Sequence, residues 1–263
     1  MNIFLLAFQE VLYRPILNLL VFFYNLPIVD FGIAIIILTI LIRLILWPLN
    51  SKSITSQRET QIKTQLLQEK MKEIKKKYKN DPNRQNEEMM KLWKENKFNP
   101  FASFLPMIIQ LIIVIALYQV LQNVLAPNGL DLLYGFVPRP EEIDPAFLGI
   151  LDLSQKSWIV AILAGVSQYF SSKMIFSFQK ESQDKKLKKE NKKKTKESSE
   201  EDRTEEMQKK MQKMMESQTT YFLPALTIFI GAALPSALPL YWLVSTLLGI
   251  IQQRIIYSKK VAV

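Results

Sequence analysis

The chain has 263 residues, 49% of them hydrophobic, and its 34 Lys and Arg against 24 Asp and Glu give a net charge of +10. It contains no Cys and no His, which excludes disulfides, thiolate catalysis, histidine acid–base catalysis and the usual zinc sites. Long apolar runs sit beside runs that are mostly Lys and Glu, a pattern typical of a membrane protein with charge concentrated in particular segments.

Residues 1–27 predict an amphipathic helix that lies in the membrane interface. Apolar residues recur there at helical spacing: Leu12, Ile16, Leu19, Leu20 and Phe23. Polar residues and a proline interrupt this pattern before it reaches the length of a span: Glu10, Arg14, Pro15 and Asn18. A poor sixth span is the alternative interpretation.

Five apolar segments are long enough to cross a hydrocarbon core of ~30 Å, which requires ~20 mostly apolar helical residues. We expect transmembrane helices at 28–49, 101–125 and 157–178, and two more within 218–257. The last two are separated only by the Pro-rich corner 235–239, so they should form a tight hairpin. The expected fold is therefore an all-α, polytopic membrane protein.

The distribution of Lys and Arg predicts the orientation. Residues 49–100 hold 13 of them and residues 173–217 hold 14, whereas only three lie in the segments on the opposite side: Arg14, Arg139 and Lys156. Because basic residues are retained in the cytoplasm, the N-terminus is expected outside and the C-terminus inside. The segment 126–156 is then an extracytoplasmic loop, and 258–263 is a short cytoplasmic tail.

The first cytoplasmic segment, 50–100, predicts an antiparallel helical hairpin. Apolar residues between 53 and 79 follow a helical stripe, and a second stripe occupies 84–97. Between them, Asp81 can cap the second helix, with Pro82 at its first position. A rigid spacer and a docking device are both compatible with this hairpin.

The second cytoplasmic segment, 179–217, predicts a basic loop that contains Met residues. Residues 179–206 hold one Leu and no aromatic residue, so they cannot bury a core. Flexible side chains that suit apolar partners follow: Met207, Met211, Met214 and Met215. Ribosomal RNA is a plausible partner for the Lys cluster, and a merely solvated basic loop is the simpler alternative.

Arg43 lies inside the first predicted span. A charge at the bilayer centre costs at least ~2.5–3.5 kcal/mol, so such a residue usually faces a hydrated cavity or a partner. Arg43 is also five residues from Pro48, so its side chain could instead reach the cytoplasmic interface. Thr39 continues its polar face, and other predicted spans supply Gln110, Gln119, Gln168, Ser171 and Ser245. These can line a shared groove or form interhelical hydrogen bonds.

Six short motifs follow one another along the chain: Leu12-Tyr13-Arg14-Pro15; Thr39-Ile40-Leu41-Ile42-Arg43-Leu44 with Pro48-Leu49; Asn99-Pro100 with Leu105-Pro106 and Gln110; Leu151-Asp152-Leu153; Phe222-Leu223-Pro224; and Leu234-Pro235 with Leu240-Tyr241-Trp242 and Gln252-Gln253. In this order, and with this topology, they resemble the YidC/Oxa/Alb family of membrane protein insertases over nearly the whole chain. The resemblance is to a short form of the family, without a large outer domain.

The resemblance implies five spans around a hydrophilic groove that is open to the cytoplasm and to lipid. Arg43 matches the groove arginine, which receives polar or acidic parts of a nascent protein. The other expected groove residues are Thr39, Gln110, Gln168, Trp242 and Ser245. An apolar face along which the substrate leaves is expected to include Ile162, Tyr169 and Leu243.

The implied function is a membrane protein insertase and chaperone in the bacterial cell membrane, with no catalytic residue, cofactor or metal. Nascent membrane proteins and the lipid bilayer are the expected partners, and the ribosome and the Sec translocase are further candidates. A membrane scaffold that recruits ribosomes or anionic lipid is one alternative. A secondary transporter is another, although the sequence shows no internal repeat and no paired intramembrane carboxylate.

Overall fold

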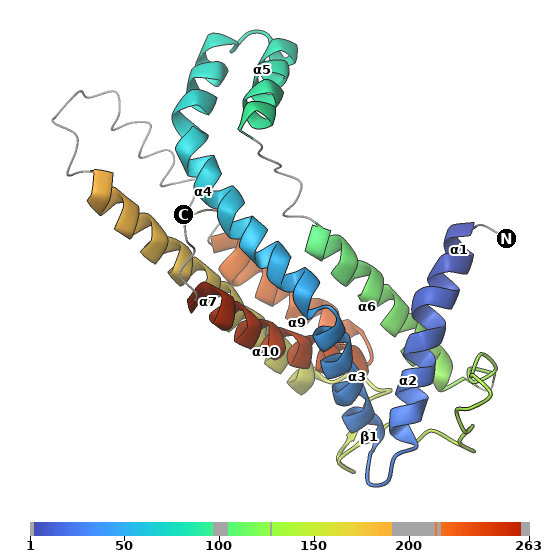
Figure 1. Ribbon diagram of the computed structural model, residues 1–263. Helices are drawn as coiled ribbons and strands as arrows, with labels where there is room; N and C mark the ends of the chain where they lie inside the picture. Colours follow the sequence, from blue (N-terminus) through green and yellow to red (C-terminus); the bar gives the residue numbers. More distant parts are fainter. Residues whose placement is uncertain (1–2, 97–104, 127, 191–213, 215–216, 259–263) are drawn as a thin grey trace. The chain divides into compact units, whose positions relative to one another are not determined.

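A computed structural model describes residues 3–96, 105–126, 128–190, 214 and 217–258 of the chain. These residues are mostly helical and form two compact units (Figure 1). The first unit contains Met1–Ile45 and Val114–Val263, and the second contains Leu46–Ile113.

Four helices of the first unit pack one against the next. Helix α7 (Trp158–Glu190) lies against both α9 (Leu223–Ala233) and α10 (Ala237–Ser258), and α10 also packs on α3 (Phe31–Ile45). A π-helical turn, η3 (Gln218–Phe222), precedes α9. The core residues that are almost fully buried include Leu38, Leu117, Val120, Ala161 and Tyr241.

Small residues let α7 and α9 approach closely. A Cβ atom added at Gly165 would lie 2.2 Å from Cγ1 of Ile228, and one added at Gly231 would lie 3.2 Å from Cβ of Ala161. Close helix contacts through small residues are typical of packing in membranes, where lipid is as apolar as a leucine side chain. This contact leaves the opposite, larger apolar side chains of α7 exposed.

At two of the predicted segments the helices begin or end at other residues than the predicted bounds. The predicted first span, 28–49, ends as a helix at Ile45, and a new helix, α4 (Trp47–Lys77), begins two residues later. Pro48 accounts for this break, because proline lacks an N–H and its ring clashes with the carbonyl four residues earlier. In contrast, α7 continues to Glu190, 12 residues into the predicted basic loop, since Lys, Glu and Gln favour helices. Residues 191–213 lie outside the described residues.

The N-terminal segment forms one helical rod made of α1 (Ile3–Phe8), a π-helical turn, η1 (Gln9–Tyr13), and α2 (Arg14–Tyr24). Ile3–Tyr24 and Trp158–Phe178 are the two described helices that are long and apolar enough to cross a membrane. A third candidate arises if α3 and the start of α4 are counted as one broken span, and Ile108–Val124 is apolar but shorter. Within the described residues, length and composition thus support two or three spans. The number five stays a prediction, as does the interfacial position of residues 1–27.

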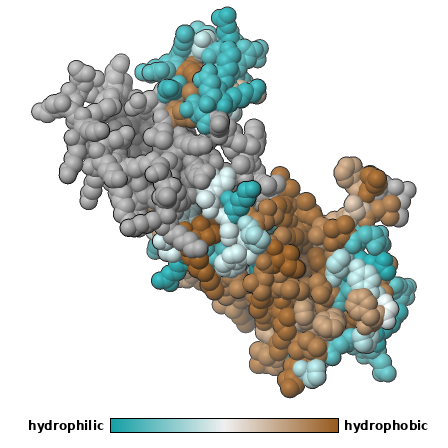
Figure 2. All heavy atoms as spheres, in the orientation of Figure 1, coloured by the Kyte–Doolittle hydropathy of each residue, from teal (hydrophilic) through white to brown (hydrophobic). Residues whose placement is uncertain are grey.

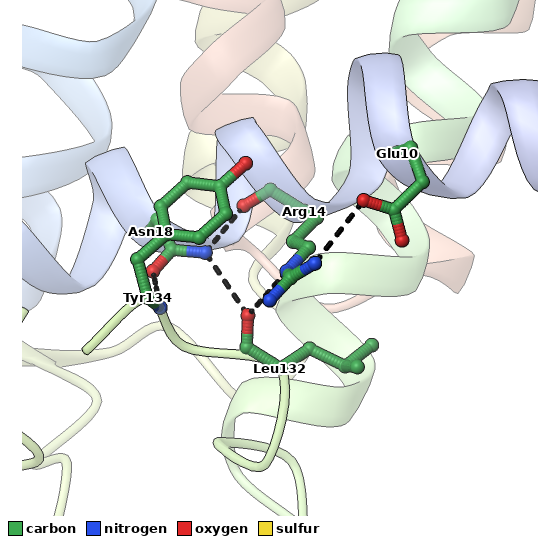
Figure 3. A network of polar contacts seen from close by, with 5 residues as sticks. All are labelled: Glu10, Arg14, Asn18, Leu132 and Tyr134. Atoms are coloured by element: carbon green, nitrogen blue, oxygen red, sulfur yellow. Dashed lines mark hydrogen bonds and ion pairs between the residues drawn. The ribbon is translucent and has the colours of Figure 1, made fainter.

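The polar residues of this rod bind the loop that follows α6 (Leu105–Val124), as Figure 3 shows. Asn18 is 3% exposed, and its Nδ2 donates to the carbonyl oxygens of Arg14 and Leu132, at 2.7 and 3.1 Å. Its Oδ1 accepts from the backbone N–H of Tyr134. Arg14 donates to Leu132 O and to Glu10, and its guanidinium lies 4.8 Å from the centre of the Tyr134 ring. The polar interruptions in the sequence therefore fasten a loop to a helix.

A two-stranded antiparallel hairpin, β1 (Ala146–Phe147) and β2 (Leu151–Asp152), contacts the beginning of α3. The Phe147 ring lies over Gly32, where an added Cβ would come within 2.1 Å of Phe147 Cδ2. Only a residue without a side chain fits under this ring. The glycine thus fixes the hairpin to α3.

The second unit is a helical hairpin of α4 and α5 (Pro82–Glu95). The predicted cap is confirmed, because the Asp81 side chain accepts from the backbone N–H of Arg84 at 3.1 Å, and Pro82 begins the helix. The two helices share a small apolar core of three buried residues, Leu67, Met89 and Leu92. Partly buried hydrophobic side chains pack around them: Met71, Ile74 and Trp93.

Candidate functional site

The candidate site is built around Arg43, in the last turn of α3. Its Nε donates a hydrogen bond to Oγ of Ser245, at 2.8 Å. Ser245 lies within α10 and is 2% exposed, whereas Arg43 is only partly buried. The packing of α3 on α10 brings these two residues together, although they are 202 positions apart in the chain.

Gly249 lies beside the terminal nitrogens of the guanidinium. A Cβ atom added there would lie 3.7 and 3.8 Å from the two terminal nitrogens of Arg43, which is ordinary van der Waals contact. Ser245 and Gly249 are four residues apart, so they occupy the same face of α10. A longer side chain at position 249 would occupy the space of the guanidinium. The Ser245 hydroxyl holds one nitrogen of Arg43, and Gly249 borders the other two.

The charge of Arg43 is not neutralised within the part of the chain that the structure describes. The ion pairs found there are Arg14–Glu10, Lys91–Glu88 and Arg139–Asp131. A guanidinium has five N–H groups, and Ser245 accepts from one of them. The terminal N–H groups suit water or a carboxylate, which an arginine binds in bidentate geometry. Among the described residues, no group of three or more His, Cys, Asp and Glu could hold a metal ion.

The other predicted groove residues differ in position. Thr39 is 1% exposed, and its hydroxyl donates to the backbone oxygen of Ile35 at 2.6 Å, so it is enclosed by the bundle. Gln168 on α7 and Trp242 on α10 are both partly exposed, on helices that pack against each other. Gln110 belongs to the second unit and is partly exposed there.

Much of the surface of the first unit is hydrophobic in Figure 2, and many hydrophobic side chains are exposed on α7 and α10, the helices that carry the predicted apolar face. On α7 these are spaced by one, three or four residues: Trp158, Ile159, Ile162, Leu163, Val166 and Phe170. Ile162 is thus one member of a continuous stripe, and Leu243 is partly exposed on α10. The Tyr169 ring packs against the Tyr221 ring, with 6.0 Å between their centres. The Nζ of Lys173 lies 5.7 Å from the centre of the Tyr169 ring.

A cavity of about 280 Å³ lies elsewhere in the first unit. Its lining includes Phe31, Leu121, Leu153 and Leu238. Phe31 is the first residue of α3, so the cavity is at the opposite end of that helix from Arg43. The cavity and the candidate site are therefore separate features.

Sequence reasoning missed Gly249 and the role of the polar residues on the N-terminal rod. The signal for Gly249 was its place one turn after Ser245 on the same helix face. The signal for the rod was the spacing of Glu10, Arg14 and Asn18, which puts three polar side chains on one face.

Comparison with known proteins shows a family relationship along almost the whole chain. Residues 22–262 match a family model described as 60Kd inner membrane protein. A protein of Clostridium tetani named membrane protein insertase YidC is 32% identical over 222 residues, which cover 84% of this chain and 79% of that protein.

Two longer relatives carry the same name. The protein of Syntrophus aciditrophicus is 34% identical over 91% of this chain, and that of Geobacter sulfurreducens is 32% identical over 94% of it. The matched regions make up only 35% and 37% of these two proteins. The chain thus spans about a third of their length.

Proposed function

This chain belongs to the 60Kd inner membrane protein family, and most of its length is similar to proteins named membrane protein insertase YidC. On that basis we propose that it inserts newly made proteins into the membrane. The family and the apolar helices make it a multi-pass protein of the cell membrane. The observation that carries the proposed mechanism is the guanidinium of Arg43, held by Ser245 and without a carboxylate partner among the described residues.

In this mechanism Arg43 attracts a short polar or acidic segment of an incoming protein. Charge-assisted hydrogen bonds from the guanidinium replace part of the hydration that a carboxylate loses on entering the membrane. Gln168 and Trp242, which are partly exposed residues on the neighbouring helices α7 and α10, are the further proposed contacts. The membrane potential assists an acidic segment by ~2.3 kcal/mol per charge per 100 mV.

The apolar part of the substrate then leaves along the exposed hydrophobic surface of α7 and α10. Ile162, Tyr169 and Leu243 belong to this surface or border it. Transfer of an apolar span into lipid is favourable by ~25 cal/mol per Å² of surface removed from water, so the proposed mechanism needs no covalent chemistry and no nucleotide.

The proposed topology has the N-terminus outside and the basic segments in the cytoplasm, where substrates arrive. The helical hairpin of α4 and α5 and the segment 179–206 carry most of the Lys and Arg residues, so they are the proposed contacts with the ribosome. The Sec translocase is a further proposed partner.

Reconstitution tests this function. The purified chain in liposomes should insert a short single-span substrate with an acidic outer tail, whereas liposomes without the protein should insert it poorly. Protection of the tail from added protease measures insertion. Equal protection in both preparations would contradict the insertase function and favour the scaffold.

A further inference from the structure

Three aliphatic side chains at the β-hairpin end of the first unit project away from the protein. Ile28 is 99% exposed, Leu148 is 61% exposed and Ile150 is 89% exposed. Ile28 precedes α3, and the other two belong to the turn between β1 and β2. We call these three residues the apolar tip.

Asp30 joins the two segments that carry the apolar tip. Its Oδ1 accepts from the backbone N–H of Ile33 at 2.7 Å and so caps the beginning of α3. Its Oδ2 accepts from the backbone N–H of Leu148 at 2.6 Å. With Phe147 lying over Gly32, the turn and the start of α3 form one piece.

The backbone at the apolar tip is left-handed. The φ angles are 67° at Ile28, 53° at Leu148 and 67° at Gly149. In a turn that faces water, such positions favour Gly, Asn or Asp, because the Cβ atom of other residues crowds the backbone there. Large aliphatic residues at two of them indicate surroundings that favour apolar side chains.

The length of α3 fits a position of this end within the thickness of a bilayer. The helix has 15 residues, about 22 Å at 1.5 Å per residue, against a hydrocarbon core of ~30 Å. For a helix that crosses the core, this length puts the segments beside α3 at the membrane boundary. Figure 2 agrees, because the hydrophobic surface of the first unit continues to the end that carries β1 in Figure 1.

We propose that the apolar tip is a membrane anchor, inserted into the lipid of the leaflet at the hairpin end. Lipid is what the apolar tip contacts, because the tip continues the exposed apolar surface of the helices that cross the bilayer. The anchor fixes the depth of one end of α3, whose other end carries Arg43. This goes beyond the insertase function and does not depend on it.

Site-directed fluorescence tests the anchor, and the absence of Cys from the chain makes single-cysteine variants straightforward. Ile150→Cys is labelled with the environment-sensitive dye NBD in liposomes of phosphatidylcholine and phosphatidylglycerol. Iodide quenches labels in water, and spin-labelled phospholipids quench labels in the bilayer. Glu141→Cys, an exposed position in the preceding loop, is the control for water, and Phe229→Cys, 71% exposed on α9, is the control for lipid.

We expect iodide to quench the Ile150 label several-fold less than the Glu141 label, and spin-labelled lipid to quench it as strongly as the Phe229 label. Iodide quenching equal to that at Glu141 would overturn the anchor. Protection from both quenchers would also overturn it, because a second copy of the chain would then cover the tip. Ile28→Cys gives an independent measurement from the other segment.

Discussion

Arg43 Nε donates to Ser245 Oγ across the contact between α3 and α10, at a distance of 2.8 Å. The hydrogen bond fixes one edge of the guanidinium and leaves its terminal N–H groups directed elsewhere. A charge inside an apolar helix is thereby held by a neutral group. In this geometry the positive charge is positioned without being neutralised by a carboxylate of the described residues.

Replacement of Arg43 tests whether its charge recruits acidic segments of the substrate. Arg43→Ala should reduce insertion of a substrate with an acidic tail much more than insertion of the same substrate with a neutral tail, because the attractive charge is lost. Arg43→Lys should insert the acidic-tail substrate less well than the unchanged protein but better than Arg43→Ala, since lysine keeps the charge and lacks the planar fork of N–H groups. Protease protection of both substrates in proteoliposomes measures the difference. Unchanged insertion of both substrates would instead assign Arg43 to the cytoplasmic interface, with no role in recruitment.

Ser245→Ala should keep the positive charge of Arg43 but remove the hydrogen bond that holds its side chain. A hydrogen bond to a charged group contributes about 1.5–3 kcal/mol, so we expect a loss of thermal stability in detergent and a smaller loss of acidic-tail insertion than Arg43→Ala causes. The matched control is Ser167→Ala, a buried serine on α7 whose hydroxyl donates to the backbone oxygen of Ala164 in its own helix. The prediction fails if both serine variants behave alike.

Asn18→Ala should detach the loop from the N-terminal rod. The substitution leaves the part-buried Tyr134 N–H without this partner, whereas Leu132 O keeps its hydrogen bond from Arg14 Nε, and an unsatisfied polar group costs about 1–3 kcal/mol where it is buried. We expect faster proteolysis of residues 126–145 and a lower unfolding temperature. Asn25→Ala, which removes one exposed hydrogen bond to Pro138 O, should have a much smaller effect.

Gly32→Ala should displace the Phe147 ring, because the new Cβ would lie 2.1 Å from Phe147 Cδ2. Overpacking of this kind typically costs about 1–3 kcal/mol. The double variant with Phe147→Ala should regain part of the loss, which thermal unfolding of the four proteins in one detergent would show. Gly135→Ala is the control, since no atom lies within 4 Å of the added Cβ. Additive losses would mean that the two residues do not interact.

Leu92→Ala should loosen the hairpin of α4 and α5. The hairpin core contains three buried residues, and removing a buried leucine side chain typically costs about 2–5 kcal/mol. We expect faster amide hydrogen exchange throughout α5, with little change in the first unit. Met90→Ala, at a position that is 52% exposed, should leave exchange unchanged. Exchange that rises equally in both units would contradict the division into two units.

The sequence by itself determined the features that depend on neighbouring residues. The helical stripes of the hairpin, its cap at Asp81 and the isolation of Arg43 in an apolar run follow from spacing and composition. The break at Pro48 could also have been predicted, because it depends on one residue and the carbonyl four positions earlier.

Only the tertiary structure decided what the polar groups inside the apolar segments contact. Ser245 is one of several uncharged polar residues in the predicted spans, and nothing local selects it as the partner of Arg43 over Gln168. Asn18 looked like an interruption of an apolar helix, but it holds a loop more than 110 residues away. A hydrogen bond needs its donor and acceptor within about 3 Å, and helix packing sets that distance between residues far apart in the chain.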